Sequence, residues 1–212
     1  MSSQSTNGLG IEDLLSSIRS CTLCNGLPLG PRPIIQAVHS SRILVAGQAP
    51  GSRAHEKCVP FDDASGKRLR HWMGIGRTDF YNPDNLAIVP MGFCYPGTGR
   101  SGDLPPRPEC ARQWRSSVLD RLPNLELTLI IGRHAMDWHL GKQPKNLTET
   151  VRNWNDHWPK ILVLPHPSPR NNLWLHHNRW FEEEILPILR NRIASILSKA
   201  TSPRLSLDDT QE

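Results

Sequence analysis

Four short apolar runs punctuate the chain, and the segments between them are either rich in Gly and Pro or carry apolar positions at helical spacing. We expect buried strands at 42–47, 86–92, 125–132 and 160–165. We expect helices at 11–20, 65–74, 111–121, 133–140 and from about 178 to 199, the last kinked at Pro187. Because strands alternate with helices or long crossovers, the pattern predicts an α/β fold: a three-layer αβα arrangement around a central four-stranded parallel sheet.

The pattern places one domain over residues 11–199. The length of 212 residues is enough for one good core. Residues 1–10 are polar and expected to be disordered, and residues 200–212 are expected to form a loose tail. No apolar run approaches the length of about 18 residues that a membrane span needs. The beginning of the chain lacks the pattern of a signal peptide, so we expect a cytoplasmic monomer with no obligate protein partner.

Charge and cysteine content narrow the possible partners. The formal charge of +5 permits a nucleic-acid partner without requiring one. The chain has five cysteines, and an odd number without an export signal argues against a disulfide framework.

Four of the cysteines fall into two pairs. Cys21 and Cys24 have the C-x2-C spacing that lets two thiolates reach one metal centre. Cys94 and Cys110 bracket a long loop rich in Gly and Pro, residues 94–110, which two thiolates at its ends could clamp. Two such pairs suit a [4Fe–4S] cluster or a structural zinc ion, and four ordinary buried cysteines are the alternative. Cys58 stands apart and is expected to be a free thiol.

The segment GQAPG, residues 47–51, follows the first predicted strand. Its glycines let the backbone approach a ligand closely, and Pro50 stiffens the turn. Backbone N–H groups there can hold an oxyanion or a base edge, although a tight turn without a ligand remains possible. A few residues later, Phe61 in VPFDD is placed to stack on a nucleobase or to fill the core.

The segment HPSPRN, residues 166–171, follows the fourth predicted strand. Its two prolines fix the direction of His166, which can donate a hydrogen bond to a developing anion. Phosphate contacts suit the polar residues Ser168, Arg170, Asn171 and Asn172. The apolar Leu173 and Trp174 suit a wedge between bases. Since ligands of parallel sheets bind at the carboxyl ends of the strands, we expect GQAPG and HPSPRN to meet in one crevice.

Together these residues resemble the uracil-DNA glycosylase superfamily. GQAPG looks like its first motif, and HPSPRN looks like its second motif, most closely that of the single-strand-selective monofunctional branch. The cysteine pattern looks like that of family 4, the iron–sulfur glycosylases. The resemblance implies the superfamily's fold, a DNA partner, and a [4Fe–4S] cluster held by the four paired cysteines. It also implies that Phe61 stacks on an extruded base and that His166 stabilises the departing base. The segment from Ser168 to Leu173 would press on the DNA strand.

Three positions depart from the superfamily pattern. Family 4 has Glu where this chain has Gln48, and the common uracil-DNA glycosylases have Asp where it has Ala49. Gln48 cannot take a proton but can orient a water, and Asp63, Asp62 or Glu56 could supply a carboxylate instead. The Asn that reads the edge of uracil is replaced by Pro90, which lies with Gly47 and Ala49 among the expected base-binding residues. Loss of a reading group predicts a changed or relaxed base preference.

Three functions remain open at this point. The first is a monofunctional DNA glycosylase that hydrolyses the N-glycosidic bond of a flipped uracil or other deaminated base in DNA repair. No Lys stands in either motif, so no Schiff base is expected. The second is a catalytically weak or inactive iron–sulfur protein of the same fold that binds nucleic acid. The third is a structural zinc protein unrelated to repair.

Overall fold

The computed structural model describes residues 10–100, 102–141 and 146–199. Its centre is a four-stranded parallel sheet in the order β2-β1-β5-β6. The strands are β1 (Ile43–Ala46), β2 (Leu86–Ile88), β5 (Leu127–Ile131) and β6 (Ile161–Leu164). In-register pairing joins Val45 to Ile88 on one side and to Leu129 on the other. The predicted sheet is therefore confirmed, with each strand slightly shorter than its apolar run.

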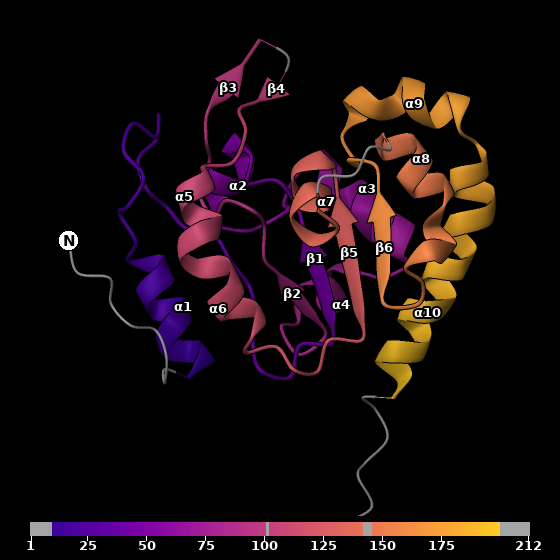
Figure 1. The fold of residues 1–212 in the computed structure, drawn as a ribbon, viewed down its shortest axis with the longest axis horizontal. Helices are drawn as coiled ribbons and strands as arrows, with labels where there is room; N and C mark the ends of the chain where they lie inside the picture. Colours follow the sequence, from indigo (N-terminus) through magenta and orange to yellow (C-terminus); the bar gives the residue numbers. More distant parts are fainter. Residues whose placement is uncertain (1–9, 101, 142–145, 200–212) are drawn as a thin grey trace, which may run out of the picture.

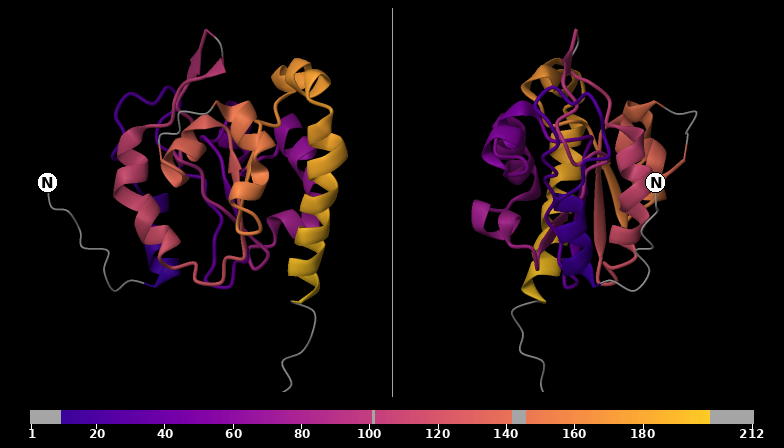
Figure 2. Two further views of the ribbon diagram at one scale, coloured as in Figure 1. Left: turned by 45° about the vertical axis from the view of Figure 1, so that its right-hand side comes forward. Right: turned by 90° about the vertical axis from the view of Figure 1, so that its left-hand side faces the viewer.

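Helices cover both faces of the sheet, as the edge-on view in Figure 2 shows. On one side lie α3 (Ala64–Met73), α4 (Arg77–Tyr81) and α10 (Leu186–Ser198), and α10 packs against α3. On the other side lie α6 (Ser116–Leu119), α7 (Arg133–His139) and α8 (Leu147–Arg152). The three-layer αβα architecture is thus confirmed. Between the layers the strand residues are almost all buried, because a parallel sheet covered on both faces has no solvent side.

The remaining elements are short. They are α1 (Ile11–Arg19), α2 (Ser52–Lys57), α5 (Pro108–Cys110), α9 (Asn172–His177), the small strands β3 (Thr98–Gly99) and β4 (Gly102–Asp103), the π-helical turns Ala111–Arg115 and Phe181–Ile185, and the 3-10 turns Trp154–Asp156 and Pro169–Asn171. The amphipathic α1 buries Leu14, Leu15 and Ile18, and it contacts α6. Of the predicted disordered start, Gly10 is described as the residue before α1; residues 1–9 and 200–212 lie outside the described residues.

Two sequence predictions need correction. The segment 94–110 is not a loop without structure, because β3 and β4 form an antiparallel hairpin inside it and α5 begins at Pro108. The final helix is also not a regular α-helix from 178. A π-helical turn at Phe181–Ile185 precedes α10, and Pro187 falls in the first turn of α10, where its missing N–H costs least.

The chain reverses direction across the sheet at β1. It leaves β1 toward the edge strand β2, then returns past β1 to add β5 and β6 on the other side. In open parallel sheets, ligands bind at such a switch point, beyond the carboxyl ends of the strands. Figure 1 shows the β3–β4 hairpin and α9 standing at this end of the sheet. Among the described residues, none of the helices is both long and apolar enough to cross a membrane.

Candidate active site

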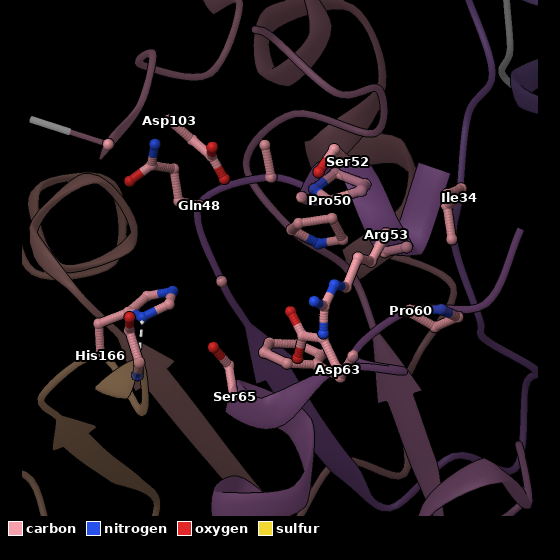
Figure 3. Close-up of a pocket in the computed structure, with 18 of the residues that line it drawn as sticks. Ile34, Gln48, Pro50, Ser52, Arg53, Pro60, Asp63, Ser65, Asp103 and His166 are labelled. Carbon is pink, nitrogen blue, oxygen red and sulfur yellow. Dashed lines mark hydrogen bonds between the residues drawn. The ribbon is translucent and has the colours of Figure 1, made fainter. Parts of the chain in front are cut away.

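A pocket of about 500 Å³ opens at the carboxyl ends of β1, β2 and β6. Its size is typical of small-ligand sites. GQAPG forms one wall and HPSPRN another, so the predicted meeting of these two segments is found in the structure (Figure 3). The lining includes most of the predicted site residues, namely Gly47, Gln48, Ala49, Phe61, Asp63, Pro90, His166, Ser168, Arg170 and Asn171.

The first wall is held by backbone hydrogen bonds to the segment after β2. The N–H of Met91 donates to the carbonyl oxygen of Gly47 (2.8 Å), and that of Gly92 donates to Gln48 (3.0 Å). The side chain of Gln48 makes a different contact, because its Nε2 donates to the carbonyl oxygen of Leu104 (2.8 Å), just beyond β4. The first motif is therefore tied both to β2 and to the hairpin.

Phe61 lies against the backbone of the first motif. Its ring edge is 3.4 Å from the position that a Cβ would take on Gly47, a van der Waals distance, so the ring packs directly on this motif. Phe61 has a φ of 54°, in the left-handed region that is strained for an aromatic residue. Such strain persists only where the surroundings impose it and is often found at ligand sites.

The surroundings of Phe61 impose this conformation. Its carbonyl oxygen accepts a hydrogen bond from the buried Arg70 (3.3 Å), and the hydroxyl group of Tyr81 donates to the preceding carbonyl, that of Pro60 (3.0 Å). α3 approaches so closely that a Cβ on Gly66 would overlap the Phe61 carbonyl. The aromatic ring is thus a fixed platform in the pocket wall.

His166 follows β6 and points into the pocket (Figure 3). Its Nδ1 accepts the backbone N–H of Ser168 (3.2 Å), so in the neutral ring the proton is on Nε2. Burial lowers the pKa of His166, and the carboxylates of Asp63 and Asp103 oppose this shift only in part. The side chain is therefore a neutral imidazole at pH 7 with one N–H free to donate.

The rest of HPSPRN is braced from within and from α3. The amide of Asn171 donates to the His166 carbonyl (2.7 Å), and the N–H of Arg170 donates to the Ser168 hydroxyl (3.3 Å). Arg68 of α3 donates to the Ser168 carbonyl (3.0 Å) and to the Asn172 side chain (2.8 Å). The predicted phosphate-contact residue Asn172 consequently lies outside the pocket lining and is engaged by Arg68.

The two apolar residues after this loop have different environments. Leu173 is 68% exposed on α9, next to the pocket loop. Trp174 packs edge-on against Trp180 and Phe181, and its indole N–H donates to Thr148 (2.8 Å). Trp174 is therefore half-buried and packed against the core, and Leu173 is the more exposed of the two predicted wedge residues.

The acidic residues near the first motif also differ. Asp63 lines the pocket and caps α3, since its Oδ1 accepts the N–H of Gly66 (2.8 Å). Asp62 forms ion pairs with Lys57 and Arg77, and hydrogen bonds from these cations lower its pKa to about 2. Asp62 and Glu56 are absent from the pocket lining, which leaves Asp63 from the predicted set.

Sequence reasoning missed the second carboxylate of the pocket, Asp103. It ends β4 and is exposed, with its Oδ2 3.5 Å from the position of a Cβ on Gly51. Asp103 is distant in sequence from both motifs, and the composition of 94–110 does not indicate a hairpin. The sequence therefore gives no sign that Asp103 reaches the pocket.

The four paired cysteines converge on a second, smaller cavity. Its lining comprises Cys21, Cys24, Cys94 and Cys110 with the apolar or aromatic residues Leu23, Leu27, Pro31, Pro33, Phe93 and Trp114. The side chain of Arg107 donates to the carbonyls of Asn25 and Gly26 and so ties the C-x2-C segment to the start of α5. Cys58 is exposed and is not among the residues of this cavity.

The surroundings of the sulfur atoms suit cluster ligands. The N–H of Phe93 donates to Cys110 Sγ (3.3 Å) and the indole of Trp114 donates to Cys21 Sγ (3.4 Å). Burial raises the pKa of Cys94 to about 11 and that of Cys110 to about 12, so a metal centre is what would draw them into the thiolate form. Within the described ranges, no three His, Cys, Asp or Glu side chains are arranged to hold one metal ion.

Comparison with known proteins adds two findings. A model of the uracil DNA glycosylase superfamily matches residues 36–190, a span that includes both walls of the pocket. The chain is also similar to a solution NMR structure from Methanosarcina acetivorans, of a protein provisionally named a uracil DNA glycosylase. The two sequences are 16% identical, and the match covers 76% of this chain and 98% of the other with a TM-score of 0.44.

Proposed function

Because the chain belongs to the uracil DNA glycosylase superfamily, we propose that it is a monofunctional DNA glycosylase that hydrolyses the N-glycosidic bond of uracil or another deaminated base in DNA. The observation that carries this proposal is the meeting of Phe61 and His166 in one pocket, at the switch point of the sheet. A flat ring platform beside a neutral N–H donor is what a flipped base needs.

The pocket supplies two electrostatic elements of such a reaction. Cleavage leaves negative charge on the base and positive charge on the sugar. His166 Nε2–H donates to the base as negative charge develops on the base. The hydrogen bond from the Ser168 N–H to Nδ1 already holds the imidazole in place. The carboxylate of Asp63, fixed by its bond to Gly66, offers negative charge for the sugar. Gln48 presents its carbonyl oxygen for a water, since its amide nitrogen is engaged with Leu104.

The surface around the pocket suits a DNA strand. Arg53 and Arg170 line the opening, and Leu173 is exposed beside them as a wedge. Among the described residues that line the pocket there is no Lys, which supports hydrolysis by water rather than through a Schiff base.

We also propose that the four paired cysteines hold a [4Fe–4S] cluster, as in the family 4 glycosylases that the cysteine pattern resembles. Their convergence on one mostly apolar cavity and the N–H donors to two of the sulfurs support this proposal. Bound there, the cluster would link the N-terminal segment to α5, since glycosidic hydrolysis moves no electrons.

The substitution His166→Ala tests the function directly, with the exposed His176→Ala as a matched control. We expect His166→Ala to slow base release by roughly 10²-fold or more, because a preorganised donor to the developing anion is lost. The control should release base at the wild-type rate. If folded wild-type protein binds DNA but releases no base, a catalytically inactive protein that binds nucleic acid explains the fold better. Gln48 would then serve only to hold Leu104.

A further inference from the structure

The carboxylate that the first motif lacks is present in the pocket, carried there by another part of the chain. We propose that Asp103 activates the attacking water and that Gln48 is the positioning residue that holds Asp103 in place. This inference rests on the proposed glycosylase function.

The geometry of the hairpin places Asp103 at the first motif. Its Oδ2 lies 3.5 Å from the position of a Cβ on Gly51, the last residue of GQAPG. Figure 3 shows Gln48 and Asp103 at the same side of the pocket that His166 faces. The carboxylate thus lies beside the first motif, the segment in which the glycosylases that it resembles carry an acidic side chain.

The hairpin is fastened at the residue after Asp103. The Leu104 carbonyl accepts the Gln48 amide (2.8 Å), and the Leu104 N–H donates to Gly97 (2.8 Å). Glu in place of Gln48 could not donate to this carbonyl. Gln48 therefore cannot accept a proton from water, but its amide holds the β3–β4 hairpin, which carries the carboxylate of Asp103.

The other carboxylates are less suited to accept a proton from water. Asp63 already accepts a helix N-terminal N–H through Oδ1, and Asp62 is occupied by two cations. Asp103 is exposed at the pocket mouth. A negative charge on a surface that meets a polyanion opposes DNA binding, so its presence there calls for a functional reason.

The proposed step is a hydrolysis that balances without any further reactant. The bond between C1′ and the base nitrogen breaks, and its electron pair leaves with the base, which His166 Nε2–H stabilises. The oxygen of water bonds to C1′, and its proton passes to the Asp103 carboxylate. The groups that share the pocket with Asp103 are the neutral imidazole of His166 and the charged side chains of Asp63, Arg53 and Arg170; the Arg170 guanidinium approaches Gly102, next to Asp103.

The test compares wild type, Asp103→Asn and the control Asp120→Asn, an exposed carboxamide substitution outside the pocket, in single-turnover base release across acid to neutral pH. We expect Asp103→Asn to slow release by roughly 10²–10⁴-fold and to flatten the fall in rate at acid pH, because the carboxylate that accepts the proton of water is gone. Binding to an oligonucleotide with an abasic site should be equal or tighter, since a negative charge has been removed from the DNA-facing surface.

Two results would overturn the inference while leaving the glycosylase function intact. One is a rate for Asp103→Asn within about tenfold of wild type, and the other is an unchanged acid limb in the pH profile. Absence of base release by wild type would instead reject the proposed function itself. Gln48→Leu serves as the second variant: it should reproduce the slower release through a displaced hairpin, and release at the wild-type rate would remove the positioning role.

Discussion

Pro90 occupies the wall of the pocket where β2 ends and where the resemblance would place a base-reading Asn. It is buried, has no N–H, and its carbonyl accepts a hydrogen bond from Arg115 (2.9 Å). The pocket therefore lacks a side-chain amide at this point, and the edge that distinguishes uracil from cytosine is unread there.

Pro90→Asn should increase the preference for uracil over other bases. The Asn side chain would add an amide to the lining of the pocket, where it can pair with the edge of the base. Competition between uracil-, hypoxanthine- and xanthine-containing oligonucleotides measures the change. An unaltered preference in a variant with wild-type thermal stability would argue against base reading from position 90.

A second residue-scale feature is the contact between Arg115 and His139 behind the pocket. Arg115 is fully buried and donates to the carbonyls of Val89 and Pro90, while its Nη2 lies 2.7 Å from His139 Nε2. Burial and the guanidinium charge lower the pKa of His139 to about 3. The imidazole must stay neutral to accept this hydrogen bond.

Acid should therefore weaken the fold through His139. Its pKa is lower in the folded than in the unfolded chain, so the unfolded state binds the proton first as the pH falls below about 6.5, and stability is lost toward pH 3. Between pH 6.5 and 4.5 the loss from this residue is on the order of 2 kcal/mol. His139→Gln keeps an acceptor without titrating, so its urea midpoint should fall less than that of wild type between pH 7 and 4.5. Equal losses would show that His139 does not govern this acid sensitivity.

Among the individual site residues, those in the two motifs could be predicted from the sequence, and Asp103 could not. His166 directly follows β6 and Phe61 lies in the turn between α2 and α3; both line the pocket as expected. Asp103 depends on a hairpin that local sequence does not specify, and Trp174, considered as a wedge between bases, is held by packing with Trp180.

At the scale of elements, the contact between α3 and the turn before it fixes the aromatic platform. Gly66 sits in the first turn of α3 against the Phe61 carbonyl, and Asp63 caps the same turn. This close approach holds Phe61 in its left-handed conformation, so the helix positions a residue that lies outside it.

Gly66→Ala should destabilise the protein by roughly 3 kcal/mol, because the added methyl group overlaps backbone that cannot move away cheaply. Gly76→Ala is the matched control: Gly76 precedes α4, has a φ of −82°, and has open space around its Cβ position. Chemical denaturation of the three proteins provides the comparison. A Gly66→Ala variant as stable as the control would mean that the turn adapts and is not fixed by α3.

Elements with strong periodicity were predictable from sequence, and short ones were not. The four apolar runs became the four strands, and α1, α3 and α7 fall within a residue or two of the expected bounds. The missed α2, α4 and α8 each have five or six residues, too few to form without tertiary contacts.

At the scale of the whole molecule, the cysteine cavity joins segments that are distant in the chain. Cys21 and Cys24 follow α1, whereas Cys94 and Cys110 flank the segment whose hairpin reaches the pocket. A cluster bound there would thus hold together the N-terminal segment, α5 and the base of the hairpin. Spacing predicted this convergence, although spacing alone could not choose between iron and zinc.

Cys94→Ser should lower iron content, brown colour and thermal stability together, because the ligand set that organises these segments is broken. Cys58→Ser, at the exposed cysteine outside the cavity, should match wild type in all three. Metal analysis of anaerobically purified protein gives the answer. Zinc in place of iron would reject the cluster, and a Cys94→Ser protein that is stable but defective only in base release would indicate a direct role in the reaction.

The proposed glycosylase activity is tested most directly by identifying the products that the wild-type protein forms from damaged DNA. Anaerobically purified protein is incubated with single- and double-stranded oligonucleotides that carry uracil, hypoxanthine or xanthine, and free base and strand integrity are measured separately. A monofunctional glycosylase releases at least one free base, and the strand stays intact until alkali cleaves the abasic site. Folded, DNA-binding protein that releases none of these bases, or that nicks the strand without alkali, would contradict it.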